Sequence, residues 1–227
     1  MRRTARVLVL GAMTWCSAVA TLAGEWSSQG RRPAPGRLEA RDQTVTCGDV
    51  SAVIRGIGLS VVFGGKALPI QVDSKTRRHE IAVPQNVEFL WSPDCNALAI
   101  TRNEFGTVGG WALEVLAIEH ASARVYGLSD QVRAEMMRIG SCVEPQEPNV
   151  AAIAWNDGSR TLRVVGEVPN HSSCRNMGQM LGFEIDARTG MISSRLSEAD
   201  LRVKWKTQLG VYMLRRAQSD VANDGSH

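Results

Sequence analysis

Aromatic residues and histidines are scarce in this chain of 227 residues. Only 5% of the residues are Phe, Trp or Tyr, and four are His. With so few histidines, the chain has few candidate residues for acid–base catalysis or metal binding. Long apolar runs are also missing, apart from one stretch near the N-terminus, which excludes a protein with several membrane-spanning helices. The remaining composition, 44% hydrophobic and 22% charged, is that of an ordinary globular protein with one or two domains.

The first residues have the pattern of a secretory signal peptide. The positive segment consists of Arg2, Arg3 and Arg6. An uncharged apolar run over 7–19 follows, and small residues offer a cleavage-type triplet at 18–20 and a later option ending at Ala23. The run is shorter than the roughly 20 apolar residues that a membrane anchor needs. We therefore expect a signal peptide over residues 1–23 and no stable membrane span after its cleavage.

The net charge of the chain comes from this same segment. The whole chain has 26 basic and 23 acidic residues, and residues 1–23 hold three of the arginines and no acid, which leaves 23 against 23. Domains that bind nucleic acid carry a basic surface stripe. We therefore expect no nucleic-acid partner. The signal peptide in turn predicts a periplasmic or secreted location.

Four cysteines remain after the signal segment: Cys47, Cys95, Cys142 and Cys174. An even number of cysteines in an exported protein predicts disulfides, here two, with three possible pairings. The alternative is a zinc site, but no two of the four lie close enough in sequence for a metal-binding knuckle. We expect no metal site, and nothing in the sequence indicates a cofactor.

The composition divides the rest of the chain into a leader, a body and a tail. Residues 24–43 are rich in Ser, Gly, Pro, Arg and Gln without apolar periodicity, which predicts a flexible leader. Residues 44–216 form a single β-rich domain, and residues 217–227 are polar and predicted to be disordered. Short strand patterns open the domain at 59–63, 67–72 and 80–83.

Two similar units follow, over residues 86–140 and 149–210. Each begins with a short apolar strand that ends in Trp, passes through a polar turn with Asp into an alternating strand, and later reaches a Ser before a helical pattern. The third strands match with Glu114 and Glu184 in equivalent positions. Unrelated hairpins can resemble each other, but agreement of several landmarks in order favours a repeated four-strand-plus-helix unit. The tryptophans are Trp91 and Trp155, and the serines are Ser129 and Ser197.

The segment Trp91–Ile100, WSPDCNALAI, resembles the W-S-P-D-G-x-x-[IL]-A-[FIV] signature of Tol-type and WD-like β-propeller blades. Residues 155–158, WNDG, resemble a contracted version. The resemblance implies antiparallel blade-like meanders and brings no catalytic residues with it. Cys95 stands where the family has Gly, which implies an altered turn held by a disulfide.

Two blades are too few to close a propeller. We therefore expect a mainly β fold with minor α, in which two units of antiparallel blade-like meanders follow an N-terminal set of strands in an open or sandwiched arrangement.

The predicted hairpin of the second unit indicates a disulfide pairing. Cys142 lies just before the strand that ends at Trp155, and Cys174 follows the strand that pairs with it. A hairpin brings the start of its first strand beside the end of its second. We therefore predict a Cys142–Cys174 disulfide, which leaves Cys47–Cys95 as the other.

One polar loop, residues 167–178, has the composition of a site. A catalytic interpretation makes His171 the base for Ser173 or for a thiolate at Cys174. The candidates for orienting the histidine are Glu167 and Asp157. The alternative is a disulfide-braced loop whose side chains satisfy turn backbone groups, or which binds a ligand as polar loops on rigid scaffolds often do. The binding candidates are Asn170, His171, Ser173, Arg175 and Asn176.

These observations predict an exported, non-enzymatic binding or interaction protein of the cell envelope. Its partner would be a protein or an envelope component, and unpaired strand edges would also permit self-association. The alternative is a small secreted hydrolase that uses the 167–178 loop. In that case, replacing His171 with Ala would abolish turnover and leave the melting temperature nearly unchanged.

Overall fold

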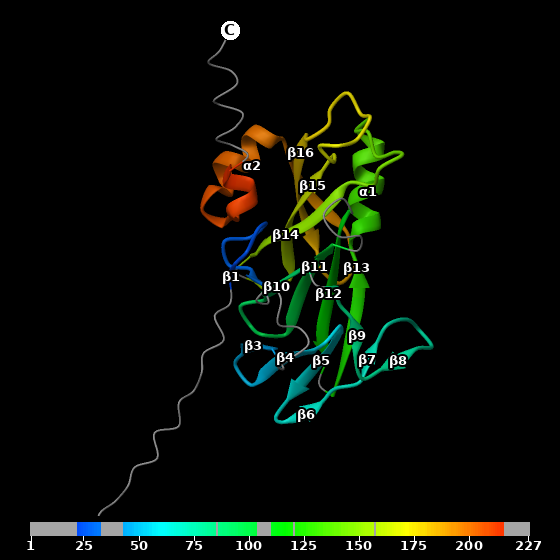
Figure 1. Cartoon of the computed structure of the whole chain (residues 1–227), viewed down its shortest axis with the longest axis vertical. Helices are drawn as coiled ribbons and strands as arrows, with labels where there is room; N and C mark the ends of the chain where they lie inside the picture. Colours follow the sequence, from blue (N-terminus) through cyan, green and yellow to red (C-terminus); the bar gives the residue numbers. More distant parts are fainter. Residues whose placement is uncertain are drawn as a thin grey trace, which may run out of the picture.

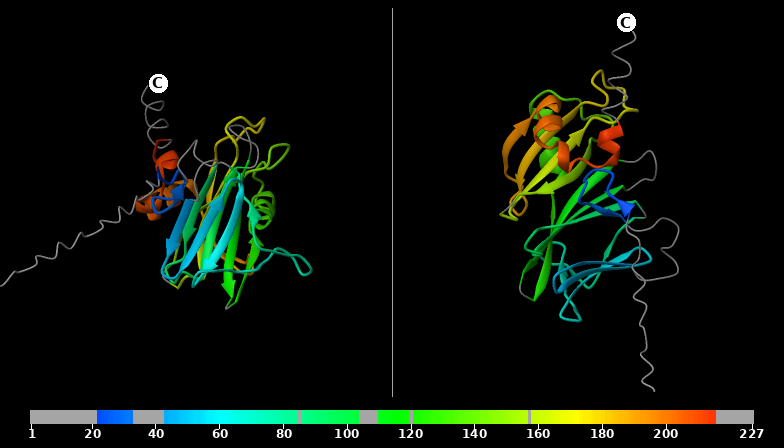
Figure 2. Two further views of the ribbon diagram at one scale, coloured as in Figure 1. Left: turned by 60° about the horizontal axis from the view of Figure 1, so that its bottom comes forward. Right: turned by 90° about the vertical axis from the view of Figure 1, so that its left-hand side faces the viewer.

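The computed structural model describes residues 22–32, 43–84, 86–103, 110–119, 121–156 and 158–215. The protein is mainly β with minor α: 47% of these described residues lie in strands and 14% in helices. Within these ranges three mostly antiparallel sheets lie face to face, and the middle sheet packs between the other two (Figure 1 and Figure 2).

The main strands of the three sheets follow the order of the chain, and short strands from elsewhere are added at the edges. The N-terminal sheet consists of β3 (Gln43–Cys47), β4 (Val50–Arg55), β5 (Gly58–Phe63) and β6 (Lys66–Ala67), with β9 (Ile81–Ala82) paired to β5. The first-unit sheet has β10 (Val87–Trp91), β11 (Ala97–Asn103), β12 (Trp111–Glu119) and β13 (Ser122–Gly127) at its centre. Its edges are extended by β1 (Leu22–Ala23) and β2 (Arg31–Arg32) beside β10, and by β7 (Ile70–Gln71) and β8 (Arg77–Arg78) beside β13. The second-unit sheet consists of β14 (Asn149–Trp155), β15 (Thr161–Glu167), β16 (Met180–Asp186) and β17 (Ile192–Leu196).

Each unit ends in a helix, so the two predicted four-strand-plus-helix units are present. Helix α1 (Ser129–Arg138) follows β13, and α2 (Glu198–Lys204) follows β17 and runs into the short 3-10 helix η2 (Lys206–Gln208). Residues 211–215 are also helical.

The strand predicted over 67–72 is divided between two sheets. β6 pairs with β5, whereas β7 pairs in parallel with β13 of the first-unit sheet. Pro69 lies at the division; it has no N–H to donate to a ladder. Its carbonyl accepts a hydrogen bond from the Ala123 N–H (2.9 Å), which joins the crossing chain to the first-unit sheet.

The middle sheet is buried on both faces. Leu98 and Ile100 of β11 pack in the cluster shared with the N-terminal sheet, whereas Ala99 between them packs in the cluster shared with the second-unit sheet. Successive side chains of a strand point to opposite faces, so a strand in a middle layer must be apolar at consecutive positions. This requirement explains the run of buried residues in β11.

The structure corrects the expectation of a flexible leader over residues 24–43. Residues 24–32, here called the strap, fold against the sheets, and Trp26 is only 1% exposed. Trp26 packs with Trp205 and Leu209 over the outer face of the second-unit sheet. The strap could not be recognised from composition, because one aromatic side chain and backbone hydrogen bonds hold it in place. Neither of these produces a periodic pattern of apolar residues in the sequence. Residues 33–42, most of the predicted signal peptide and the predicted tail lie outside the described ranges.

Both predicted helices are present, but they begin differently. Ser197 caps α2, since its Oγ accepts a hydrogen bond from the Asp200 N–H (3.2 Å). The cap position of α1 is Leu128, and the Ser129 Oγ instead accepts a hydrogen bond from the Leu113 N–H of β12 (2.8 Å). Ser129 therefore ties the helix to the sheet. No helix in the described ranges is long and apolar enough to cross a membrane.

Replacing Trp26 with Ala tests the strap. Because the indole is fully buried, Trp26→Ala should lower the free energy of unfolding by about 3–5 kcal/mol, measured by urea denaturation. Val203→Ala on neighbouring α2 is the control: Val203 is 79% exposed, and its truncation should change the stability by less than about 0.5 kcal/mol. A loss below about 1 kcal/mol for Trp26→Ala would contradict a folded strap.

Candidate functional site

The two units repeat one turn conformation. Trp155 follows Trp91 by 64 residues, and Ser159 follows Cys95 by the same interval. Cys95 and Ser159 have φ angles of 61° and 53° and are the only non-glycine residues with positive φ in the described part of the chain. Cys95 thus adopts the left-handed conformation that glycine favours, at the position where the blade signature has Gly.

The hydrogen bonds of the two turns correspond as well. The Ser92 N–H donates to the Ala97 carbonyl (2.8 Å), and 64 residues later the Asn156 N–H donates to the Thr161 carbonyl (3.0 Å). In return, the Ala97 N–H donates to Ser92 Oγ (2.9 Å) and the Thr161 N–H to Asn156 Oδ1 (3.2 Å). Equivalent side chains close equivalent turns, so the two units are structural repeats.

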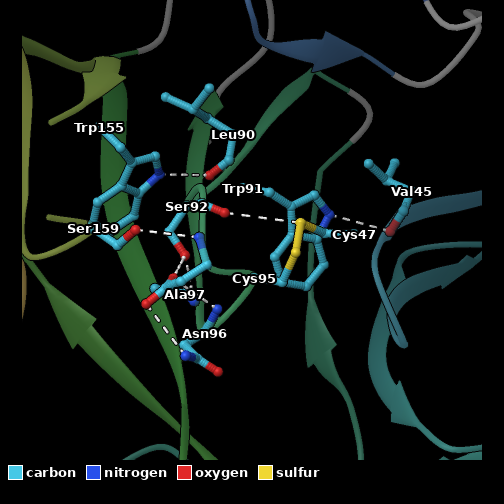
Figure 3. The surroundings of a disulfide bond; sticks show 11 residues. Val45, Cys47, Leu90, Trp91, Ser92, Cys95, Asn96, Ala97, Trp155 and Ser159 are labelled. Carbon is cyan, nitrogen blue, oxygen red and sulfur yellow. Dashed lines mark hydrogen bonds between the residues drawn. A yellow bond between two sulfur atoms is a disulfide. The ribbon is translucent and has the colours of Figure 1, made fainter. Parts of the chain in front are cut away.

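The two tryptophans join each sheet to the one before it (Figure 3). Trp91 Nε1 donates to the Val45 carbonyl of β3 (3.3 Å), and Trp155 Nε1 donates to the Leu90 carbonyl of β10 (3.0 Å). Both bonds run from the first strand of a unit to the first strand of the preceding sheet. The N-terminal sheet thus takes the place of a preceding unit.

The structure contains two disulfides, in the pairing predicted from the sequence. Cys47–Cys95 joins the end of β3 to the turn after Trp91, with Cα atoms 5.4 Å apart. Cys142–Cys174 joins the segment after α1 to the 167–178 loop, with Cα atoms 5.9 Å apart. The bridges lie at opposite ends of the strands, since β15 begins at the repeated turn and ends at this loop.

The structure does not bring the predicted loop residues together. Asn170 Nδ2 donates to the Tyr212 hydroxyl (3.4 Å), and Asn176 Nδ2 donates to Gln179 Oε1 (2.6 Å). No hydrogen bond joins His171 to another side chain in the described ranges, and the sulfur of Cys174 is in a disulfide. Asp157 lies outside the described residues. The exposed members of the predicted set are Asn170, His171, Ser173 and Arg175, and Asn176 is half-buried.

Glu167, the other candidate orienting group, is fully buried and has a structural role. Its Oε2 accepts a hydrogen bond from Asn149 Nδ2 (2.8 Å), and its Oε1 accepts one from the Tyr212 hydroxyl (2.9 Å). Asn149 Oδ1 in turn accepts from the Trp111 N–H (3.0 Å). The carboxylate therefore links both units to the segment after α2, away from His171.

A polar cleft lies at the other end of the strands. This turn-end cleft of about 370 Å³ opens between the first-unit and second-unit sheets. The Asp94 N–H donates to Ser159 Oγ (3.2 Å), so the two repeated turns touch beside it. A second hollow of about 600 Å³, between the N-terminal and first-unit sheets, shares Asn96 and Arg188 with the cleft. The polar lining of the turn-end cleft comes mainly from Asp94, Asn96, Ser159, Arg160, Asp186 and Arg188.

Asp186 is held ionised by its neighbours. Burial raises the pKa of Asp186, but the carboxylate accepts hydrogen bonds from Arg160 (Nε–Oδ2 2.5 Å) and from the N–H groups of Arg188 and Thr189 (3.1 and 2.9 Å). These donors outweigh the burial and lower the pKa to about 2. Asp186 is thus a charged wall of the cleft and fixes the turn that carries Arg188.

The cleft contains one guanidinium without an ionic partner. Arg188 is exposed and forms no ion pair with any residue that the structure describes. Burial raises the pKa of Asp94, but hydrogen bonds from Ser92 and Asn96 outweigh it and lower that pKa, so this acid is also ionised. No cluster of three or more His, Cys, Asp or Glu side chains in the described ranges has the arrangement of a metal site.

The turn-end cleft was missed in the sequence because its residues come from three separate hairpin turns. The repeated turn motif was the available signal. If two units stack in register, their equivalent turns must lie side by side, and Asp94 then meets Ser159. To predict that Arg188 lines the cleft, one would need to know the length of the β16–β17 turn and the order of the sheets, and hydrophobic periodicity gives neither.

No protein-family model matches this chain, and no curated protein does. Among solved structures, the chain is similar to the acylaminoacyl peptidase of Pyrococcus horikoshii in an orthorhombic crystal form, with 15% sequence identity and a TM-score of 0.34. The similarity covers 70% of this chain and 25% of the peptidase, so the chain spans about a quarter of that protein. Similarity at this level assigns no activity.

The left-handed turn gives a prediction for chains that lack the Cys47–Cys95 disulfide. With Cys47→Ser as background, Cys95→Gly should be more stable than Cys95→Ser by about 0.5–1 kcal/mol. A left-handed φ costs a non-glycine residue about 1–2 kcal/mol, and Cys95→Gly avoids this cost. The greater flexibility of glycine in the unfolded state offsets about 0.5–1 kcal/mol of the resulting stabilisation. Urea midpoints measure the difference. Neighbouring Asn96, whose φ is not positive, is the control: there Asn96→Gly should be less stable than Asn96→Ser. Equal stability of Cys95→Gly and Cys95→Ser would contradict the left-handed conformation of the turn.

Asp186 gives a pH-dependent prediction. Because its pKa falls from 3.8 to about 2 on folding, ionised Asp186 stabilises the fold above about pH 4, and this contribution disappears as the pH falls through about 2. Asp186→Asn should therefore lower the free energy of unfolding by about 1 kcal/mol at pH 7, since Arg160 is exposed and the pair is screened by water. The difference should shrink between pH 4 and pH 2 in urea titrations; a constant difference over this range would refute the assignment.

Proposed function

We propose that this chain is an exported, non-enzymatic binding protein of the cell envelope, periplasmic or secreted, whose ligand occupies the turn-end cleft. Two features support export. The first 23 residues have the charge and apolar pattern of a signal peptide. Both disulfides are of the kind that form in an oxidising compartment.

The available guanidinium of Arg188 is the observation that carries the binding site. The backbone that presents it is fixed, because Asp186 accepts hydrogen bonds from Arg160 and from the N–H groups of Arg188 and Thr189. The opposite wall of the cleft is fixed by the disulfide at Cys95. A pre-organised guanidinium with several free donors suits a carboxylate or another acceptor-rich group of a protein or envelope component.

The same cleft is poorly suited to acid–base catalysis. A general acid or base works best when its pKa lies near the operating pH. Asp186 has a pKa of about 2, and the pKa of Asp94 is lowered below its ordinary value. Both carboxylates stay ionised at neutral pH and can accept hydrogen bonds from a ligand, which favours binding over turnover.

Comparing two arginines at opposite ends of the strands tests this function. The exported protein, Arg188→Ser and Arg175→Ser are each immobilised and exposed to a solubilised envelope fraction, and the retained species are quantified by mass spectrometry and titrated. Arg188→Ser should weaken binding of the retained ligand about 10- to 100-fold, the value of a lost hydrogen-bonded charge pair. Arg175→Ser changes the predicted 167–178 loop and should leave binding unchanged.

Two results would contradict the proposal. Loss of binding in Arg175→Ser with normal binding in Arg188→Ser would place the ligand on the 167–178 loop. Retention of nothing beyond what an empty matrix retains would exclude a binding function in the envelope fraction tested.

A further inference from the structure

The strap surrounds a buried carboxylate. Glu88 of β10 is 2% exposed. Its Oε2 accepts hydrogen bonds from the N–H groups of Glu25 (2.8 Å) and Trp26 (3.0 Å), and its Oε1 accepts one from the Ser27 N–H (2.8 Å). Burial raises the pKa of Glu88, and these three donors oppose the rise. The carboxylate is thus the centre on which the strap is organised.

Glycine lets the strap approach Glu88 closely. A Cβ atom on Gly24 would lie 2.4 Å from Glu88 Oε1, and one on Gly30 would lie 2.0 Å from it. Real Cβ atoms do not make such contacts, so the backbone of Gly24 lies directly against the carboxylate. Its Cα is within about 4 Å of Glu88 Oε1, given a Cα–Cβ bond of ordinary length.

The carbonyl groups of the strap fix it from the other side. The Val211 N–H donates to the Gly24 carbonyl (3.2 Å), and the Tyr212 N–H donates to the Glu25 carbonyl (2.9 Å). These N–H groups belong to the first turn of the helix at 211–215, where no partner exists within a helix. Gly24 is therefore held at a defined position beside Glu88.

Glu88 has no cation in contact with it. No Lys, Arg or His side chain in the described ranges forms an ion pair with Glu88, and Arg32, whose charge acts on Glu88 through space, pairs with Glu25 instead. Burying a carboxylate without a paired cation is costly, even with amide donors. An ammonium group on Gly24 would remove that cost, and this residue follows the later cleavage option at Ala23.

We propose that export processing cuts the chain between Ala23 and Gly24, and that the new α-ammonium of Gly24 binds the carboxylate of Glu88. Water hydrolyses the Ala23–Gly24 peptide bond in the host's signal peptidase; Ala23 leaves as a carboxylate, and the amine of Gly24 takes up a proton. The inference rests on the export part of the proposed function. It makes Glu88 a receptor for the processed N-terminus.

The earlier cleavage option, after Ala20, would not supply this cation. It would leave residues 21–23 attached and a neutral amide at Gly24. Compared with cleavage after Ala23, it would keep one additional strand, β1, which is two residues long and pairs with β2 alone at the edge of the sheet. Cleavage after Ala23 removes that short edge strand and leaves every hydrogen bond to Glu88 in place.

The first measurement is the N-terminus of the exported protein. The full chain is expressed with its own signal segment in a Gram-negative host, and intact mass and N-terminal sequencing identify the first residue of the periplasmic product. Gly24 is expected. Ala20→Leu, which blocks the earlier option, should leave this result unchanged, whereas Ala23→Leu should abolish the Gly24 terminus.

The second measurement is the titration of the new terminus. The α-amine of the exported protein is dimethylated with a ¹³C label, which keeps its charge, and its pKa is followed by NMR. An ordinary α-amine titrates at about 7.7–8.0. The pKa should lie at least one unit higher in the wild-type protein and return to the ordinary range in Glu88→Gln. If Glu88→Gln does not fold, two other measurements test the inference. One is the raised pKa of the Gly24 α-amine in the wild-type protein. The other is urea denaturation of an Ala23→Leu product that retains residues 21–23, whose folding equilibrium constant should be at least tenfold lower than that of the wild-type protein.

The outcomes separate the inference from the function on which it rests. A product that begins at Thr21, or a Gly24 α-amine with an ordinary pKa in the wild-type protein, overturns the inference and leaves export in place. An uncleaved chain retained in the cytoplasm overturns both.

Discussion

Two indole hydrogen bonds hold the three sheets in register. The indole N–H groups of two tryptophans find acceptors on the first strand of the preceding sheet: Val45 for Trp91 and Leu90 for Trp155. The bond fixes the height of each sheet against its neighbour as well as their separation. The burial of β11 on both faces and the contact between the two repeated turns both depend on this register.

The register also explains why the polar groups gather at one end. Equivalent turns of stacked units must lie side by side, so the turn of Asp94 and the turn of Ser159 form adjacent walls. The opposite end has unrelated connections, a helix and a braced loop, whose side chains bond within the loop or to Tyr212. A repeat therefore produces a cleft at its short turns more readily than at its long loops.

Much of the fold could be predicted from the sequence, because a Trp, a polar turn and a Ser before a helical pattern recur in the same order in both units. Three features escaped prediction for physical reasons. The third strands are displaced by one residue from the match of Glu114 with Glu184: Leu98 pairs with Leu116, and its equivalent Leu162 pairs with Ile185. Such a shift depends on the length of the connecting loop. The strap is held by backbone groups around Glu88, which leave no side-chain pattern. The turn-end cleft could not be predicted without knowing the order in which the sheets pack.

The strap has a consequence for the order in which the molecule is assembled. Its backbone bonds reach the far end of the chain, as from the Ser28 N–H to the Gln208 carbonyl (2.8 Å). A polypeptide is made from its N-terminus, so these contacts wait until nearly all of it has emerged, and contacts of such sequence separation form late. Until then Trp26 and the outer face of the second-unit sheet stay uncovered. The chain therefore keeps this apolar surface exposed until its synthesis is nearly complete, and exposed apolar surface makes a folding intermediate prone to aggregation.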